Sequence, residues 1–226
     1  RQYEQTESLR AFFTLKRTVI VMNHYFTDNR HLAQNRKEIT FRFSCFTCHF
    51  LTDNGVFCKD HVDFGTRTLL DAVHASGLLG EEVLDLGCGY GVIGITLKKQ
   101  YPDSAFTLAE VNPRALELAQ ENAARNGAEV TCVCSDVYSG VEGNTFTDIL
   151  TNPPIRAGKK VIYQMFEQAY DHLREGGRLW VVIRKQQGAA SAREKIAQVF
   201  GSCEIISREK GYLVLLAKKV DKLTGD

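Results

Sequence analysis

Three glycines at alternate positions, Gly87, Gly89 and Gly91, follow a short apolar run at residues 83–86. Glycine lets the backbone turn sharply and approach a ligand without a Cβ in the way. The residues after the turn begin a helix, whose free N–H groups would point at whatever lies in the turn. The pattern therefore predicts a cradle for a nucleotide-like cofactor, although glycine spacing alone does not choose among such cofactors.

Two carboxylates narrow that choice. Asp85, at the end of the first apolar run, repels a pyrophosphate but favours a ligand that carries cationic groups, and S-adenosylmethionine carries an ammonium and a sulfonium. Glu110 ends the next apolar run about twenty residues after the turn, where a carboxylate accepts paired hydrogen bonds from vicinal ribose hydroxyls. Together they favour S-adenosylmethionine, with a nicotinamide cofactor as the rival.

A second set of residues that could take part in catalysis is Asn152-Pro153-Pro154-Ile155, directly after the apolar run 147–151. Two adjacent prolines fix the backbone and remove two N–H donors, which leaves carbonyl oxygens beside the Asn152 side chain. Such acceptors can take both hydrogens of a planar exocyclic amine. These hydrogen bonds strengthen as positive charge builds on nitrogen, so they stabilise the transition state of methyl transfer more than the ground state. No side chain is indicated as a general base, and the proton is expected to leave to water.

The run Asp85-Leu86-Gly87-Cys88-Gly89-Tyr90-Gly91 resembles the first motif of class I S-adenosylmethionine-dependent methyltransferases. Asn152-Pro153-Pro154-Ile155 resembles the [ND]-P-P-[YFI] signature of the members that methylate amino groups. Members with Tyr or Phe at the fourth position stack the target base on that ring, whereas Ile155 cannot. The candidates for a replacement ring are Tyr25, Phe26, Phe57 and Tyr163.

Residues 55–66 resemble the segment of the ribosomal RNA guanine-N2 methyltransferases that lies over the methionine end of the cofactor. Lys59, Asp63, Gly65 and Thr66 match that pattern, and Cys58 replaces its usual serine. A loop that caps a helix is the structural alternative, since Asp and Thr both cap well, and the two interpretations are compatible. The run from Asn152 to Lys159 is most similar to the small-subunit (16S) enzymes. The resemblance covers residues 23–219, and larger members carry two tandem domains, of which this chain matches the catalytic one.

The positions of the motifs, together with the resemblance, indicate three sets of site residues. The catalytic residues would be Asn152, Pro153, Pro154 and Ile155. The cofactor, with its adenine amino group bonded to Asp136, would be bound by Lys59, Asp63, Gly65, Thr66, Asp85, Gly87, Cys88, Gly89, Glu110, Val111, Asn112, Asp136, Val137 and Asn152. Phosphates of RNA would be held by Arg156, Lys159, Lys160, Arg184 and Lys185, for which a solvated charged face is the alternative.

The implied activity is methyl transfer from S-adenosylmethionine to guanine N2 in small-subunit ribosomal RNA, with that RNA or the small ribosomal subunit as partner. The amine-binding motif leaves adenine N6 and protein glutamine N5 open, because both are planar amines. A non-catalytic RNA-binding module with a vestigial cofactor site is an alternative of another class. The sequence indicates no oligomeric state.

Strand-like and helix-like runs alternate after residue 61, which predicts a parallel sheet with right-handed crossovers. We expect an α/β, Rossmann-like class I methyltransferase fold: a doubly wound sheet of seven strands, the last antiparallel, with an N-terminal β-hairpin extension. The predicted strands are 83–86, 105–109, 130–134, 147–151, 177–184, 203–207 and 212–217. The predicted helices are 66–75, 92–100, 113–126, 159–174 and 191–200.

The chain divides into four expected parts. Residues 1–21 show no clean period and no signal-peptide pattern, and Met22 is a natural start, so they are expected to be an extension outside the fold. Residues 22–60 would form the hairpin module, with paired strands at 39–43 and 48–52. Its basic and aromatic residues, which either contact nucleic acid or form a solvated face, are His24, Tyr25, Phe26, Arg30, Arg36, Lys37 and Arg42. Residues 61–220 would form the methyltransferase domain and 221–226 a tail.

Charge and cysteine content limit the kinds of partner and of cellular compartment that fit this chain. The 226 residues carry 28 basic and 27 acidic side chains, so a partner rich in phosphate must be held by a local patch. The seven cysteines are scattered and odd in number, which favours a reducing cytoplasm over a disulfide framework. Cys45-x-x-Cys48-His49 has no second ligand pair, so no metal is expected, and no apolar run is long enough to span a bilayer.

Overall fold

The computed structural model describes residues 35–56 and 58–220. The expected extension over residues 1–21, the start of the hairpin module and the tail at 221–226 lie outside the described residues. So do His24, Tyr25, Phe26, Arg30 and Phe57. The predictions made for these parts of the chain stay predictions.

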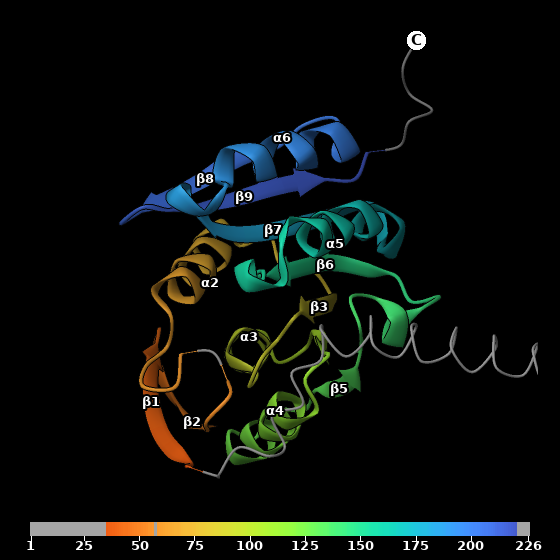
Figure 1. Cartoon of the computed structure of the whole chain (residues 1–226). Helices are drawn as coiled ribbons and strands as arrows, with labels where there is room; N and C mark the ends of the chain where they lie inside the picture. Colours follow the sequence, from red (N-terminus) through yellow and green to blue (C-terminus); the bar gives the residue numbers. More distant parts are fainter. Residues whose placement is uncertain (1–34, 57, 221–226) are drawn as a thin grey trace, which may run out of the picture. The chain divides into compact units, whose positions relative to one another are not determined.

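Seven strands form one sheet in the order β5-β4-β3-β6-β7-β9-β8 (Figure 1). The strands are β3 (Glu82–Leu86), β4 (Ala105–Glu110), β5 (Thr131–Cys134), β6 (Phe146–Thr151), β7 (Leu173–Arg184), β8 (Glu204–Glu209) and β9 (Tyr212–Lys218). β9 runs antiparallel to both of its neighbours, β7 and β8, and the pairs from β5 to β7 are parallel. The predicted doubly wound sheet with an antiparallel last strand is confirmed.

The strand order reverses between β3 and β6. From β3 the chain proceeds through β4 to β5 at one edge, then returns to β6 on the other side of β3. In open α/β sheets a ligand binds outside the carboxyl ends of the strands at such a reversal. Both sequence motifs, the glycine turn after β3 and the Asn-Pro-Pro run after β6, stand at this point.

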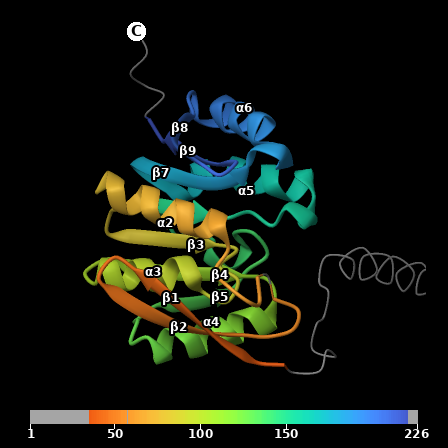
Figure 2. The same ribbon diagram turned by 90° about the vertical axis from the view of Figure 1, so that its left-hand side faces the viewer.

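Helices cover both faces of the sheet (Figures 1 and 2). One face carries α2 (Phe64–Ser76), α3 (Val92–Gln100) and α4 (Pro113–Arg125), and the other carries α5 (Lys159–His172) and α6 (Ala189–Phe200). Because side chains alternate along each strand, the apolar core is divided into two: a first core under α2, α3 and α4, and a second core under α5 and α6. Val83 belongs to the first core, whereas Leu84 and Leu86 belong to the second.

The helix predicted at 159–174 is too long at its end, and the strand predicted at 177–184 is too short. Leu173 already pairs with Phe146 on β6 and is buried, so the strand starts there. The register then shifts before Arg178 pairs with Asp148, and Gly176 in this shift has φ 77°. Long-range pairing, which helical periodicity does not contain, decides this boundary.

The N-terminal hairpin consists of β1 (Lys37–Phe43) and β2 (Phe46–Thr52) and lies against the α3–α4 face (Figure 2). Its apolar side chains join the first core. Asn122 of α4 and Asn126, the C-cap of α4, bond to β2 as a neighbouring strand would. Asn122 bonds the N–H and C=O of Leu51 at 2.6 and 3.0 Å, and Asn126 bonds those of His49 at 2.9 and 2.8 Å.

The potential zinc ligands Cys45, Cys48 and His49 do not share one side of the hairpin. Cys48 is buried, whereas Cys45 and His49 are exposed. Within residues 35–56 and 58–220, no group of three or more His, Cys, Asp and Glu side chains is placed to hold a metal ion. No helix in these same ranges has the length and apolar character needed to cross a membrane.

Candidate functional site

The glycine turn after β3 is held from β4. Gly87, Gly89 and Gly91 have φ of 72°, 58° and 94°, a region that side-chain-bearing residues rarely adopt. The N–H groups of Gly87 and Cys88 both donate to the carbonyl of Ala109, at 2.9 and 3.0 Å. A Cβ placed on Gly89 would meet no heavy atom within 4 Å. The turn is thus fixed on one side and open on the other.

Glu110, at the end of β4, is half-buried beside this turn. Its Oε2 accepts a 2.8 Å hydrogen bond from the N–H of Gly89, and its Oε1 accepts one of 2.9 Å from Asn112. Asn112 in turn caps α4 through its side chain, which accepts from Arg114 N–H. Val111 lies between them and is half-buried. The structure therefore brings Gly89, Glu110, Val111 and Asn112 together, as the sequence predicts.

Asp85 lies beneath the turn and is fully buried. Its Oδ2 accepts a 2.8 Å hydrogen bond from Gly94 at the start of α3, and its Oδ1 has no hydrogen-bond partner among the described residues. Burial raises the pKa of this carboxyl to about 7, the Gly94 bond opposes that rise, and the nearby charge of Glu110 adds to it. The donor set fits a cofactor with a cationic group, because a cation would relieve a buried and half-bonded carboxylate.

Asp136 and Val137 follow β5 on the same edge of the sheet. Asp136 is exposed, and its N–H donates to Ser139 Oγ at 3.0 Å. Val137 has φ 53°, a strained conformation for a β-branched residue, and its carbonyl accepts a hydrogen bond from Ser135. Strain of this kind persists where the surrounding structure enforces it, often at a ligand site.

The Asn-Pro-Pro loop lies beside the glycine turn because the two preceding residues are bonded. Thr151 Oγ1, at the end of β6, donates a 2.8 Å hydrogen bond to the carbonyl of Leu86, at the end of β3. Pro153 is buried, Pro154 is exposed, and Ile155 begins a short 3-10 helix that leads to α5. Ile155 packs partly against the second core.

The segment before α2 contacts the same loop. Asp63 is the N-cap of α2 and accepts a 3.1 Å hydrogen bond from Thr66 N–H, as the capping interpretation predicts. The amide nitrogen of Asn152 donates to Asp63 Oδ2 and to Thr66 Oγ1, each at 3.0 Å. Lys59 differs from the rest of the segment, because its ammonium donates to Asn54 Oδ1 at 2.7 Å, in the turn after β2.

The predicted RNA-contacting residues divide into two groups. Arg156, Lys159 and Lys160 are exposed beyond the Asn-Pro-Pro loop, and the Lys159 ammonium lies 5.0 Å from the ring centre of Tyr163. Arg184 and Lys185 are exposed at the end of β7, and the Arg184 guanidinium lies 5.8 Å from the ring centre of Tyr212.

Tyr163 is not placed as a free stacking ring. The Lys159 and Lys195 ammonium groups lie 5.0 and 5.5 Å from its ring centre. Its hydroxyl donates to the carbonyl of Ser191 at 3.3 Å. The structure gives no support to the proposed role of Tyr163 in stacking on a base.

Tyr212 and Phe64 lie at the candidate site, although the sequence analysis does not include them. Their ring centres are 5.9 Å apart, and the Tyr212 hydroxyl donates to Asp63 Oδ1 at 3.4 Å. Lys210 places its ammonium 4.8 Å from the ring centre of Phe64. The available signal was the antiparallel last strand, since its first residue must lie at the edge where the parallel strands end.

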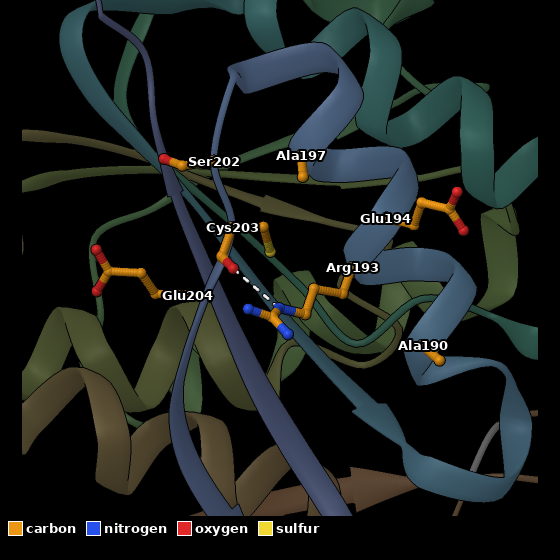
Figure 3. A pocket seen from close by; sticks show the side chains of 7 residues that line it. All are labelled: Ala190, Arg193, Glu194, Ala197, Ser202, Cys203 and Glu204. Atoms are coloured by element: carbon orange, nitrogen blue, oxygen red, sulfur yellow. Dashed lines mark hydrogen bonds between the residues drawn. The ribbon is translucent and has the colours of Figure 1, made fainter.

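A separate hollow lies between α6 and the start of β8, at the opposite end of the strand order from β5 (Figure 3). Arg193 reaches across it and donates to the carbonyl of Cys203 at 3.0 Å, while Glu194 points away on the helix. No predicted site residue lines it. The strand ends, not this hollow, carry the candidate site.

Comparisons with known proteins show the family to which the chain belongs. The profile of the family "Methyltransferase small domain" matches residues 47–216. The chain is 43% identical to "Uncharacterized protein YbxB" of Bacillus subtilis, over 87% of this chain and 98% of that protein. It is 35% identical to "Ribosomal RNA small subunit methyltransferase C" of Actinobacillus pleuropneumoniae, over 72% of this chain and 50% of that protein.

A solved structure has a similar fold. The T. thermophilus 16S rRNA N2 G1207 methyltransferase (RsmC), in complex with AdoMet and guanosine, superposes with a TM-score of 0.76 at 25% identity, covering 83% of this chain and 52% of that one. The chain thus spans about half the length of the ribosomal RNA methyltransferases it matches. With its fold, its glycine turn and its Asn-Pro-Pro loop, the chain belongs to the methyltransferase small domain family and has the class I methyltransferase fold.

Proposed function

We propose that this protein transfers a methyl group from S-adenosylmethionine to an exocyclic amine, and that the amine is guanine N2 in small-subunit ribosomal RNA. The observation that carries the proposal is the contact between two motifs. The Thr151–Leu86 hydrogen bond sets the amine-binding Asn152 loop beside the glycine turn. Such an arrangement brings an acceptor and a bound donor together for in-line transfer.

S-adenosylmethionine is the cofactor expected from the sequence, and the family and the AdoMet bound in the T. thermophilus enzyme support it. It supplies an electrophilic methyl group on a sulfonium. We propose that the glycine turn and Glu110 bind its ribose end, that Asp136 and Val137 bind its adenine, and that Asp63 and Thr66 cover its amino-acid end. The buried carboxylate of Asp85 favours the cation electrostatically.

The acceptor amine would be held by the Asn152 side-chain oxygen and the adjacent loop carbonyls. Its lone pair forms the new N–C bond while the S–C bond breaks, S-adenosylhomocysteine leaves, and the amine proton passes to water. Hydrogen bonds to the amine gain strength as its charge grows, which lowers the barrier. The two prolines keep these acceptors fixed before the amine arrives.

RNA as the acceptor is supported by a cationic and aromatic cluster at the same strand ends. It consists of Phe64, Arg184, Lys210 and Tyr212, and it touches the site through the Tyr212–Asp63 contact. Cations beside aromatic rings are typical of surfaces that bind single-stranded nucleic acid. A ribosomal substrate places the reaction in the cytoplasm. We further propose residues 61–220 as the catalytic domain and 22–60 as the hairpin module.

Guanine N2 is supported by the guanosine bound in the T. thermophilus enzyme. Large-subunit ribosomal RNA is a second candidate substrate, because the chain is 33% identical to "Ribosomal RNA large subunit methyltransferase G" of Pseudomonas putida, over 79% of this chain and 48% of that protein. Adenine N6 and glutamine N5 remain chemical alternatives, because the loop recognises a planar amine.

The test is mass mapping of modified nucleosides in ribosomal RNA from a strain without this protein. One N2-methylguanosine of the small-subunit RNA should be lost, and restored by the wild-type protein but not by Asn152→Ala. Loss from the large-subunit RNA would move the substrate to that subunit. Loss of a methyladenine from the RNA, or of methylglutamine from a protein, would make adenine or glutamine the acceptor in place of guanine. Unchanged modification, with RNA binding by the protein intact, would favour the non-catalytic alternative.

A further inference from the structure

The side-chain amide of Asn152 is bonded only through its nitrogen among the described residues. That nitrogen lies 3.0 Å from Asp63 Oδ2 and 3.0 Å from Thr66 Oγ1, and both partners come from the start of α2. Asp63 precedes Asn152 by 89 residues, so the contact joins two distant parts of the chain.

The chemistry of the partner fixes which way the amide faces. An ionised carboxylate is an acceptor only, so the NH₂ end of Asn152, and not its oxygen, must point at Asp63. Turning the amide over would set two oxygens against each other at hydrogen-bond distance and would leave the carboxylate without this donor. The Asn152 oxygen is therefore directed away from Asp63.

We infer that Asp63 is a positioning residue for the methyl transfer, which fixes the Asn152 amide with its oxygen free to accept a hydrogen of the substrate amine. The inference rests on the proposed function, and it gives Asp63 a task beyond the expected cofactor contact. A freely rotating Asn152 would present NH₂ to the substrate part of the time, and two NH₂ groups repel each other.

Asp63 is itself held in place by a residue of β9. Tyr212, the first residue of β9, donates its hydroxyl to Asp63 Oδ1 at 3.4 Å. Gly65 leaves room for this arrangement, because a Cβ there would lie 2.6 Å from the Tyr212 ring and 2.8 Å from Asp63 Oδ2. Oδ2 also accepts from Thr66 N–H at 3.1 Å. The carboxylate thus has a defined orientation before it meets Asn152.

Capping α2 is the competing explanation for an aspartate at this position, and one substitution separates the two roles. Serine caps a helix about as well as aspartate but is shorter and uncharged. Asp63→Ser should keep the cap and lose the partner of Asn152, whereas Asp63→Ala should lose both. Asp60→Ser is the matched control, since Asp60 is an exposed aspartate in the same segment that pairs with Lys37 at 2.7 Å.

Four proteins are compared: wild type, Asp63→Ser, Asp63→Ala and Asp60→Ser. We expect Asp63→Ser to unfold near the wild-type temperature while kcat falls by about tenfold or more, because a small loss of alignment is costly in transfer reactions. Cofactor affinity by calorimetry should fall as well, because Asp63 is also an expected cofactor contact, but kcat should stay low at saturating S-adenosylmethionine. Asp60→Ser should keep kcat within about twofold. Asp63→Ala should lose both stability and kcat.

A second measurement does not depend on catalysis. The Asn152 side-chain NH₂ signals, identified by their absence in Asn152→Ala, should exchange slowly with solvent in the wild type and about tenfold or more faster in Asp63→Ser. This readout tests the positioning even if the wild type fails to methylate ribosomal RNA, which would overturn the proposed function alone.

Two results would overturn the inference. Near-normal kcat in Asp63→Ser would show that Asp63 acts only as the N-cap of α2. A loss confined to cofactor affinity, with kcat restored at saturating S-adenosylmethionine, would make Asp63 a cofactor ligand and not a positioning residue.

Discussion

The backbone N–H of Gly89 and the carboxylate of Glu110 are joined by a 2.8 Å hydrogen bond, so the glycine turn and the end of β4 form one unit. A second bond, from Asn112 N–H, holds the other carboxylate oxygen at 2.9 Å. Glu110 is therefore oriented before any ribose binds, and its removal changes the turn as well as the proposed ribose contact.

Glu110→Ala should weaken cofactor binding by about tenfold or more, with much of the rate recovered at high cofactor concentration, because the loss is in binding and not in the transfer step. Calorimetry with S-adenosylhomocysteine measures it. Glu110→Gln is the matched variant, which keeps an oxygen for one of the two N–H groups and should lose less. Equal affinity of wild type and Glu110→Ala for S-adenosylhomocysteine would show that Glu110 does not bind the cofactor.

Asn152→Ala should lower methyl transfer by about two orders of magnitude or more, a loss of roughly 3 kcal/mol, comparable to deleting one preorganised transition-state hydrogen bond. Cofactor affinity should change much less. An unstructured RNA substrate serves as the control, because a base paired within a helix must first leave the stack. Normal turnover on both substrates would contradict the assigned role of the Asn-Pro-Pro loop.

Asp85 should make the cofactor-free protein less stable as pH rises. Its pKa is raised from 3.8 to about 7 by burial, so the unfolded chain releases this proton from about pH 4 and the folded protein only near pH 7. Its contribution to the free energy of unfolding therefore falls by about 1.4 kcal/mol per pH unit in that window, and is constant above it.

The measurement compares wild type with Asp85→Asn by denaturant unfolding between pH 4 and pH 8. Other carboxyl groups contribute equally to both proteins and cancel in the difference. The stability of Asp85→Asn relative to wild type should rise across the window, whatever its offset. A difference independent of pH would show that Asp85 is ionised when buried.

Gly65→Ala should lower both stability and turnover, although alanine is the better helix former. The added Cβ would lie 2.6 Å from the Tyr212 ring and 2.8 Å from Asp63 Oδ2, so one of the two must move. Overpacking of this kind costs roughly 1–3 kcal/mol. Tyr212→Ala removes one of the two clashes, and the stability loss from Gly65→Ala should be smaller in that background. An unchanged unfolding temperature and kcat in Gly65→Ala would show that the contact relaxes without cost.

Asn122→Ala should lower the free energy of unfolding by roughly 2–4 kcal/mol, because buried backbone groups lose their partners. Besides the two bonds to Leu51, the Asn122 amide donates to the carbonyl of Tyr90 at 2.9 Å, so it links the hairpin to the glycine turn. Asn126→Ala is the control: its bonds to His49 are exposed and water replaces them, so the loss should be under about 1 kcal/mol. Equal losses in the two variants would contradict this account.

Much of the fold was predictable because local signals and packing agree. Val92–Gln100 forms the helix expected, and Pro113 begins the next one as its position predicts. The exception is the α5–β7 boundary, where the pairing of Leu173 with Phe146 overrides a helical pattern. No window of the local sequence contains that pairing.

The candidate site, like the fold, could be predicted from the sequence only in part. The turn around Gly89 and its partner Glu110 follow from strand ends and spacing. The Asn152–Asp63 bond and the Tyr212–Asp63 contact do not, since they join residues 89 and 149 positions apart. Side chains that meet only after the sheet has formed leave no period in the sequence.

β9, which lies between β7 and β8 in the sheet, is synthesised after all the other elements that form the candidate site. Tyr212 is added 149 residues after Asp63, an interval of roughly 7–30 s at translation rates of about 5–20 residues per second. During this interval the growing chain gains first the glycine turn and then the Asn-Pro-Pro loop, while the strand that holds Asp63 is still missing. A nascent chain is therefore expected to bind cofactor before it can transfer a methyl group at the full rate.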